Sequence, residues 1–557
     1  MGRIYGGHLA AKYMKQTENV TTVFTISGGH IENLLDGFTE YGIRTIDVRH
    51  EQAAAMMAHA WSIYTGEPGV CLVTAGPGFT NALTGIANAA LDNAPLVVLC
   101  GRHPLRDDLT GALQELNQVD MVKPVAKWTA TCYETRRIPE YLSTAFRQAV
   151  TGRPGPVFLE LPPDILFAAE EEKNIEIPRR KHHKCVVHPA QEELAAAADL
   201  INRAERPVFL GGSGIGFSPC RGALQAFVET TGMPFALFNN GRGTLPDDHA
   251  RCINDCGFTG IMSGLPQADV IVAAGIRFNW MLQSGSHFPD AKVVRIDIDP
   301  AEIDRNRAAD AGLTGDCADV LGRLNPLLEK HDHADWAARL KNACSAFMTT
   351  ELEKRQQAAD PIHPVRLVAK IQEFFGTDAY YVADGGDTTY YGVAGFLSKN
   401  RAGVLAPASG LLGCLGTGIP FAMAAKLIHP DKPAVIFNGD GSFGFNSMEF
   451  DTAVRHNIPV ICVVNNDCAW GMIKHAQEMS LGAERCTCSE LGMRNYHQMV
   501  AGLGGHGELV TTDDQILPAL QRAVDSGKPA CINVVTDPNV TSPATVLFYQ
   551  SFTGFGQ

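Results

Sequence analysis

The sequence predicts an α/β protein made of three doubly wound parallel-sheet domains. Apolar runs of strand length alternate with helix-like stretches in three successive blocks of the chain, as in βαβ units. Two segments of different composition separate the blocks: an acidic run that ends in basic RRKHHK at 179–184, and a charged stretch at about 330–362. We therefore expect an N-terminal domain over 1–175, a central domain over 190–330 and a C-terminal domain over 360–557.

The first block contains four apolar runs with two alanine-rich helical stretches between them. The runs are TTVFTI, RTIDV, GVCLVTA and APLVVLC, and the helical stretches are EQAAAMMAHAWSIYTG and NALTGIANAALD. The block closes near GPVFLELPPDIL. This order of strands and helices predicts a parallel sheet.

The second block has the same alternation, from RPVFLGGSGIG through ADVIVAAGIRF to AKVVRIDIDPAEI. Its glycine-rich turn GGSGIGF follows a strand and could be a dinucleotide loop, which would make the protein an NAD-dependent dehydrogenase. However, the turn lacks the full GxGxxG spacing. A tight turn in a doubly wound domain explains it better.

The third block brings polar residues to strand ends. The apolar run AVIFN stops at GDGS, residues 439–442, and the next run IPVICVV ends in NNDCAWG. Ligands bind at the carboxyl ends of strands in open parallel sheets, and glycines with free amides there favour a phosphate. Because Asp440 cannot pair directly with a phosphate, we expect Mg²⁺ to bridge the two.

Composition excludes several classes of protein. The 557 residues are 45% hydrophobic and 19% charged, an ordinary balance for large buried cores. The net charge of −14 argues against a nucleic-acid surface. Apolar runs such as 94–100 are too short for a membrane span, and the N-terminus has no signal-peptide pattern, so we expect a cytoplasmic protein. The 15 scattered cysteines include no CxxC pair, which favours reduced thiols over a zinc site.

The GDG segment, followed after 24 intervening residues by the Asn466-Asp467 pair, resembles the motif of thiamin-diphosphate-dependent enzymes. The three blocks also follow the order of that family's pyrimidine-binding, central and pyrophosphate-binding domains. The resemblance implies thiamin diphosphate and Mg²⁺ as cofactors. It implies Asp440, Asp467 and the Ala469 carbonyl as metal ligands, with Asn466 as the alternative side-chain ligand, because the family commonly has an asparagine where Asp467 stands.

A second mark of the family is Glu51, at the strand-to-helix junction in IDVRHEQAAAMM. Alone, it would be a helix-start acid favoured by the helix dipole. Beside the GDG motif, it resembles the glutamate that activates the cofactor, which acts as an electron sink. The resemblance implies further cofactor contacts at Gly386, Asp387, Gly413, Leu415, Gly441, Ser442 and Met472. Among these, Leu415 would support the bent cofactor, and the Gly413 carbonyl would accept from its amino group.

Within the family, the sequence looks most like benzaldehyde lyase and nearby acetolactate-synthase-like proteins. His30 and Gln114 match the polar residues that face cofactor and substrate in benzaldehyde lyase, where His30 would relay protons. Ser27 and Ser409 replace two histidines of that enzyme, and Met472 replaces a small residue. These differences suggest a smaller or aliphatic donor.

The expected function is a carbon–carbon lyase or carboligase acting on aldehydes and 2-hydroxyketones. One alternative is an acetolactate-synthase-like enzyme that decarboxylates a 2-keto acid; in that case FAD could occupy the central domain, although FAD is not favoured. Another is a catalytically silent binding or regulatory homologue. The resemblance also implies a homodimer or homotetramer whose active sites combine Glu51 of one chain with Asp440 of another.

Overall fold

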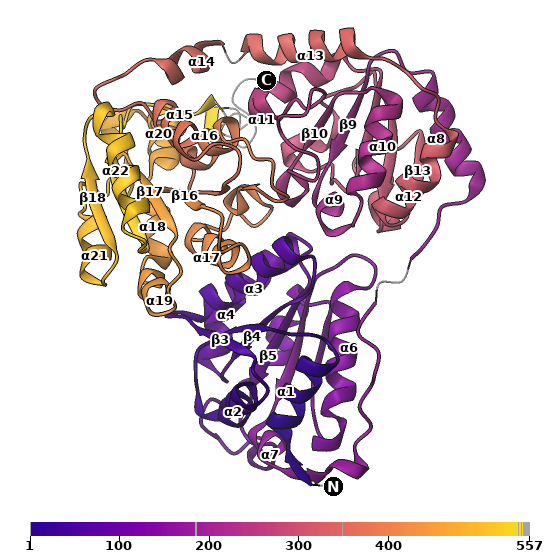
Figure 1. Cartoon of the computed structure of the whole chain (residues 1–557), viewed down its shortest axis with the longest axis vertical. Helices are drawn as coiled ribbons and strands as arrows, with labels where there is room; N and C mark the ends of the chain where they lie inside the picture. The colour runs from indigo at the N-terminus through magenta and orange to yellow at the C-terminus, as the bar shows by residue number, and fades with distance from the viewer. Residues whose placement is uncertain (1, 184–185, 348, 544, 547–548, 550–557) are drawn as a thin grey trace. The chain divides into compact units, whose positions relative to one another are not determined.

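The computed structural model describes the whole chain except residues 1, 184–185, 348, 544, 547–548 and 550–557. Three parallel sheets carry the fold, as the alternation of strands and helices predicted (Figure 1). Contacts within the chain separate two compact units. The first comprises 1–185, 410–428 and 446–456, and the second comprises 186–409, 429–445 and 457–557. The expected domain limits stay a prediction.

The N-terminal sheet has the strand order β3-β2-β4-β5-β7-β6, and all its pairs are parallel. Its strands are β2 (Thr22–Thr25), β3 (Arg44–Asp47), β4 (Gly69–Val73), β5 (Leu96–Gly101), β6 (Trp128–Thr131) and β7 (Pro156–Leu161). The helices of this region are α1 (Gly6–Gln16), α2 (Glu32–Glu40), α3 (Glu51–Thr65), α4 (Pro77–Leu91), α5 (Gln118–Val122), α6 (Ile138–Val150) and α7 (Pro163–Leu166). A short antiparallel pair joins β1 (Arg3–Tyr5) to β8 (Ala169–Glu171).

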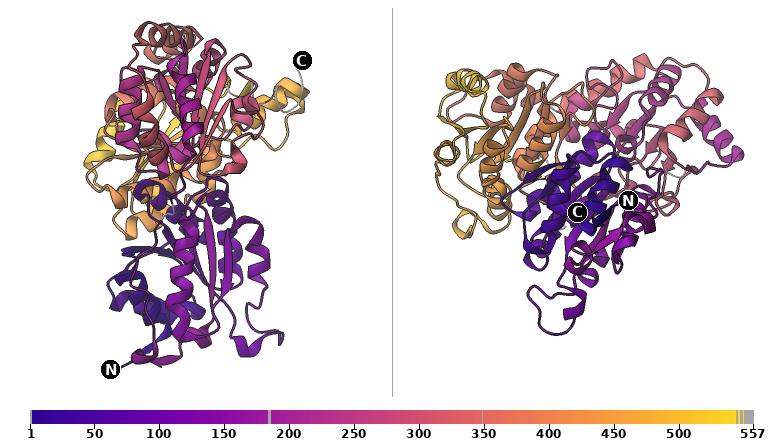
Figure 2. Two further views of the ribbon diagram at one scale, coloured as in Figure 1. Left: turned by 90° about the vertical axis from the view of Figure 1, so that its right-hand side faces the viewer. Right: turned by 60° about the horizontal axis from the view of Figure 1, so that its bottom comes forward.

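Helices cover both faces of this sheet (Figures 1 and 2). Val157 and Leu159 of β7 lie in the core cluster that includes residues of α1, α2 and α6. Phe158, between them, packs edge-on against Phe79 of α4, with ring centroids 5.2 Å apart. Because successive strand residues point to opposite faces, a continuously apolar strand is what a doubly covered parallel sheet requires.

The central sheet has the order β10-β9-β11-β12-β13. Its strands are β9 (Pro207–Gly211), β10 (Phe235–Leu237), β11 (Val270–Ala274), β12 (Lys292–Asp297) and β13 (Ala311–Thr314), with helices α8 (Gln191–Asn202), α9 (Ser213–Phe217), α10 (Arg221–Thr231), α11 (Gly257–Gly264) and α12 (Cys317–Leu324). The glycine-rich turn lies against a second glycine turn: a Cβ on Gly214 would lie 2.6 Å from the Gly275 Cα. This close backbone packing accounts for the glycines as a tight turn.

The C-terminal sheet has the order β15-β14-β16-β17-β19-β18. Its strands are β14 (Tyr380–Asp384), β15 (Val404–Leu405), β16 (Ala434–Gly439), β17 (Ile461–Asn466), β18 (His506–Val510) and β19 (Ala530–Val535). The helices of this region are α14 (Thr349–Gln356), α15 (Pro364–Phe375), α16 (Asp387–Gly395), α18 (Asp440–Asn446), α20 (Gly471–Leu481), α21 (Tyr496–Gly502) and α22 (Asp513–Asp525). Helix α13 (Ala334–Phe347) packs on the central sheet, where Trp336 Nε1 donates to the Pro207 carbonyl at 2.9 Å. Helices α17 (Gly418–Ile428) and α19 (Glu449–Arg455) belong to the first compact unit. None of the described helices has the length and apolar character needed to cross a membrane.

A histidine in the basic run that follows the N-terminal sheet contacts two carboxylates and an aromatic ring. The His182 ring has Nδ1 2.7 Å from Glu18 Oε2 and Nε2 3.2 Å from Glu67 Oε2, and it stacks on Phe146. Although burial lowers the pKa of His182, hydrogen bonds to Glu18 and Glu67 raise it overall. Lys181 also pairs with Glu67.

We therefore expect His182→Gln to cost more stability at pH 6 than at pH 8.5. A group whose folded-state pKa is raised contributes fully below its ordinary pKa of about 6.5, and the contribution is lost as pH rises through the folded-state value. The free energy of unfolding should fall by about 1–2 kcal/mol at pH 6, measured by urea denaturation. The exposed neighbour His183→Gln is the control. Equal losses at both pH values would contradict the ion pairs.

Candidate active site

Three neighbouring strands of the C-terminal sheet end at one edge and carry the expected cofactor residues. Strands β14, β16 and β17 are adjacent and parallel, so the segments after Asp384, Gly439 and Asn466 lie side by side. Helices α16 and α20 also begin at this edge, at Asp387 and Gly471. Parallel strand ends with helix N-termini are a favourable place for an anionic ligand.

A buried carboxylate, Asp440, and a half-buried one, Asp467, lie next to each other at this edge. Asp440 is 2% exposed; its Oδ1 accepts from the Gly441 amide at 2.8 Å, while its Oδ2 is buried without a hydrogen-bond partner. Asp467 Oδ1 accepts from the Ala469 amide at 3.2 Å. Burial and the nearby Asp467 raise the pKa of Asp440 to about 8, and burial raises the pKa of Asp467 to about 6. A divalent cation with oxygen ligands would neutralise this pair.

Asn466, the alternative ligand, faces into the fold. Its side chain is fully buried, its amide nitrogen donates to Asn533 Oδ1 at 2.9 Å, and its Oδ1 accepts from the Cys468 amide at 3.1 Å. Both ends of the amide therefore have protein partners. This geometry favours the Asp467 carboxylate over Asn466 as the side-chain ligand.

Glycines leave room around the carboxylates. A Cβ on Gly471 would lie 2.2 Å from Asp467 Oδ2, and a Cβ on Gly441 would lie 2.5 Å from the Trp470 ring. Met472 lies against Gly386, where a Cβ would meet the Met472 Cβ at 2.5 Å. The Ser442 hydroxyl is buried and donates to the carbonyls of Asp384 and Gly439, which joins two of the strand ends.

Asp387 has protein partners on both carboxylate oxygens. Its Oδ2 lies 2.9 Å from His475 Nδ1, and its Oδ1 accepts from the Ser542 amide and the Thr545 hydroxyl. The other ring nitrogen of His475 lies 2.9 Å from the Pro538 carbonyl. The Asp387 side chain thus ties the C-terminal segment to this edge, and its expected contact with a diphosphate stays a prediction.

Glu51 is the first residue of α3, directly after the loop that follows β3. It is 8% exposed, and its Oε2 accepts from Asn81 Nδ2 at 3.0 Å. The loop before it is held by Glu449, whose Oε1 accepts from the amides of Arg49 and His50 at 3.0 and 3.1 Å. Glu449 is 1% exposed, and burial raises its pKa to about 7.

We expect Glu449→Ala to destabilise the protein and to disturb Glu51. The change removes the acceptor of two amides and of the Thr452 hydroxyl, which together should cost about 3 kcal/mol of unfolding free energy. Glu51 directly follows the two freed amides, so its side chain should be misplaced and turnover should fall about tenfold. Urea denaturation and kcat measure the two effects. Asp451→Ala, on the same helix, is the control and should cost less than about 1 kcal/mol.

His30 and Gln114 lie at the edge of the N-terminal sheet. His30 Nδ1 is 3.3 Å from the Thr74 hydroxyl, and burial together with the nearby His103 lowers the pKa of His30. The Gln114 side chain lies against Gly76, where a Cβ would be 2.9 Å from the Gln114 Cβ. Gln118, which we did not predict, accepts from the Gly76 amide at 2.8 Å and donates to the Gly101 carbonyl.

Gly413 and Leu415 precede α17 in the same compact unit as Glu51. Gly413 has a φ of 66°, which a residue with a side chain rarely adopts. Asn446 donates to the Gly416 carbonyl at 2.6 Å and so fixes the segment that Leu415 belongs to. Their expected contacts with the cofactor stay predictions.

Comparison with known proteins assigns the class of this site. Models of the thiamine pyrophosphate enzyme family match the chain three times: the N-terminal TPP binding domain at 4–121, the central domain at 194–324 and the C-terminal TPP binding domain at 384–534. A probable acetolactate synthase from Mycobacterium bovis is 36% identical over 97% of each chain. A 2-hydroxyacyl-CoA lyase from Arabidopsis thaliana is 30% identical over 96% of each chain. The human 2-hydroxyacyl-CoA lyase 2 is also 30% identical, over 95% of this chain and 90% of the relative.

The chain therefore belongs to the thiamine pyrophosphate enzyme family, and its relatives include proteins named acetolactate synthase and 2-hydroxyacyl-CoA lyase. It is a thiamin-diphosphate-dependent lyase or carboligase. A specific relationship to benzaldehyde lyase stays a prediction.

Proposed function

We propose that the protein cleaves and forms carbon–carbon bonds in 2-hydroxyketones, with aldehydes as products or acceptors. Thiamin diphosphate supplies an electron sink for the carbonyl carbon when it is bound. Asp440, Asp467 and the Ala469 carbonyl would hold Mg²⁺ on its diphosphate. Glu51 would hold a proton at the cofactor ring, while His30 would exchange a proton with the substrate hydroxyl and Gln114 would orient it.

The observation that carries this proposal is the neutral character of three side chains at this edge, His30, Thr74 and Gln114. The lowered pKa of His30 leaves the imidazole uncharged near neutral pH, so it can accept a proton from a hydroxyl. Gln114 and Thr74 are also neutral, and Arg102, which follows β5, is paired with Asp108. Neutral polar groups fit a hydroxyketone or an aldehyde better than the carboxylate of a 2-keto acid.

The second candidate is a decarboxylating carboligase of the acetolactate synthase type. The 36% identity to a protein named probable acetolactate synthase favours it. The relatives named 2-hydroxyacyl-CoA lyase favour bond cleavage without a 2-keto acid. Because the relatives carry the names of both kinds of enzyme, the products of the reaction must be measured to separate the two candidate functions.

Proton NMR of the products decides between the candidates. One sample contains protein, thiamin diphosphate, Mg²⁺, a 2-hydroxyketone and an aldehyde; the other replaces the 2-hydroxyketone with pyruvate. Aldehyde exchange in the first sample supports the proposal. Turnover only with pyruvate, with release of CO₂, would transfer the protein to the acetolactate synthase type.

We further propose a cytoplasmic homodimer or homotetramer without FAD, in which Glu51 of one chain and Asp440 of another complete each active site. The purified protein should be colourless, whereas absorbance near a flavin maximum would indicate FAD. Analytical ultracentrifugation with activity at matched concentrations tests the assembly. A monomer with full activity would contradict a shared site.

A further inference from the structure

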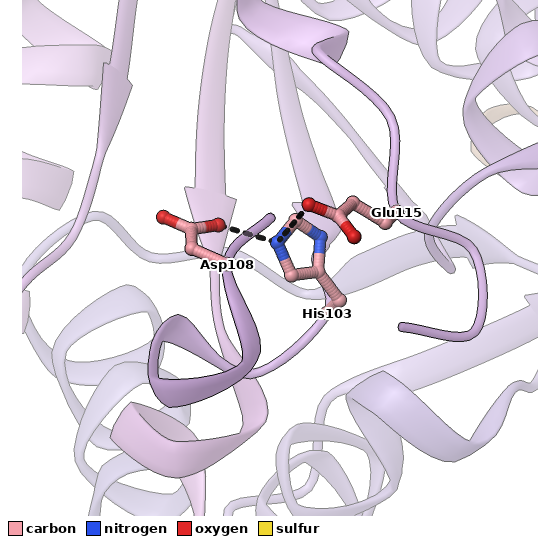
Figure 3. Close-up of side chains that lie close together, drawn as sticks. All are labelled: His103, Asp108 and Glu115. Carbon is pink, nitrogen blue, oxygen red and sulfur yellow. Dashed lines mark hydrogen bonds and ion pairs between the residues drawn. The ribbon is translucent and has the colours of Figure 1, made fainter. Parts of the chain in front are cut away.

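A group of polar side chains, two carboxylates and a histidine, closes a loop beside the proposed site. His103 follows β5, Asp108 follows the 3-10 turn η2 (Leu105–Asp107), and Glu115 lies in the loop before α5. The His103 side chain is 2% exposed and points between the two carboxylates (Figure 3). Its Nε2 donates to Asp108 Oδ1 at 2.5 Å and lies 3.9 Å from Glu115 Oε1.

These three residues have the types of a metal site, but their donor atoms are already used. Arg102 Nη2 donates to the same Asp108 Oδ1 at 2.5 Å. Glu115 Oε1 accepts from the Leu109 amide at 2.5 Å, and its Oε2 accepts from the amides of Gly111 and Ala112 at 2.8 and 3.0 Å. A cation would have to displace a guanidinium and three amides. The group therefore acts as a clasp, a set of ion pairs and hydrogen bonds that fastens residues 105–116 to the end of β5.

The fastened loop carries Gln114 in a strained conformation. Gln114 has a φ of 61°, in the left-handed region that a residue with a side chain seldom occupies. Its neighbour Glu115 accepts from three amides of the loop. The Oε1 of Gln114 is buried without a hydrogen-bond partner. If the clasp were lost, the backbone at Gln114 would relax to a more common conformation. The side-chain amide of Gln114 would then move away from the substrate edge.

We propose that His103 is a positioning residue that, through Asp108 and Glu115, holds Gln114 in place at the substrate edge. This inference rests on the proposed function of Gln114 as a group that orients the substrate. Replacing His103 should open the loop and weaken the use of substrate, while thiamin diphosphate binding stays the same. Misplacing one orienting group lowers the fraction of bound substrate in a productive geometry.

The test compares His103→Gln with Asp108→Asn and Gln114→Ala. The control is His8→Gln, because His8 also lies between two carboxylates, Asp36 and Glu40, but on α1. Trypsin reports the loop directly, since the Arg106 side chain within it is 75% exposed. Cleavage after Arg106 should be at least about threefold faster in His103→Gln and Asp108→Asn, and unchanged in His8→Gln.

In kinetics, His103→Gln should raise KM for the 2-hydroxyketone about tenfold and change kcat less than about threefold. The double variant His103→Gln/Gln114→Ala should be no worse than Gln114→Ala alone, because both act on one contact. Unchanged cleavage in both clasp variants, or fully additive KM effects, would overturn the inference. If cleavage is faster in the two clasp variants but Gln114→Ala leaves KM unchanged, the proposed function of Gln114 is refuted and the clasp itself is supported.

Discussion

Asp440→Asn is expected to abolish Mg²⁺-dependent binding of thiamin diphosphate. The amide replaces a carboxylate whose Oδ2 is buried and unpartnered, beside the Asp467 carboxylate. Since loss of an outer-shell partner already costs about 10–100-fold in metal affinity, loss of a ligand should cost about 100-fold or more. Trp470, which lies against Gly441, provides a fluorescence signal for titration with cofactor and Mg²⁺.

The same change should stabilise the protein when no cofactor is present. Folding without a cation must either bury two charges at Asp440 and Asp467 or protonate one of them, and an amide avoids both costs. We expect a gain of about 1–3 kcal/mol in the free energy of unfolding. Thermal unfolding with and without Mg²⁺ and cofactor measures it, with the half-buried Asp451→Asn as control. Asp440→Asn that binds Mg²⁺ and cofactor like the wild type would refute the metal site.

Glu51→Gln is expected to remove turnover and keep cofactor binding. Glutamine has the same shape and can still accept from Asn81, so the N-terminus of α3 should keep its structure. An amide cannot exchange a proton at the cofactor ring, and loss of such a group costs about 10²–10⁴-fold in rate. Product formation by NMR and the cofactor titration separate the two properties.

The control for this change is Glu32→Gln, an exposed acid at the first position of α2. If Glu51 is only a helix-start acid that interacts favourably with the helix dipole, both variants should lose about a few tenths of a kcal/mol in the free energy of unfolding and retain activity. Full activity of Glu51→Gln would also revive the alternative of a catalytically silent homologue. Together, Asp440→Asn and Glu51→Gln separate loss of binding from loss of turnover.

Much of the architecture could be predicted because it depends on local pattern. Apolar runs of strand length between helical stretches require parallel strands covered on both faces, and the three sheets confirm this. The GDG segment and the Asn-Asp pair end consecutive strands, β16 and β17, which are neighbours in the sheet. Their side chains could therefore be placed at one edge before the structure was known.

Contacts between segments far apart in the chain could not be predicted. Glu449 accepts a hydrogen bond from the Arg49 amide, which is 400 residues away in the sequence. The Asn466 side-chain amide donates to Asn533 on β19. Gln118 and His103 gave no sequence signal, because a buried amide and a lone histidine occur in many loops. Each of these contacts depends on how helices and strand ends meet after folding.

The sequence by itself determined the fold class and indicated the class of protein. The alternation of apolar runs with helical stretches predicts three parallel sheets, and the GDG segment with the Asn-Asp pair resembles the motif of thiamin-diphosphate-dependent enzymes. Only the tertiary structure decided which oxygens have no partner. Asp440 and Asn466 look alike as polar residues at strand ends, yet one carboxylate oxygen is unsatisfied and the amide is fully bonded. Hydrogen-bond satisfaction is a property of the packed neighbourhood, and residue type alone does not contain it.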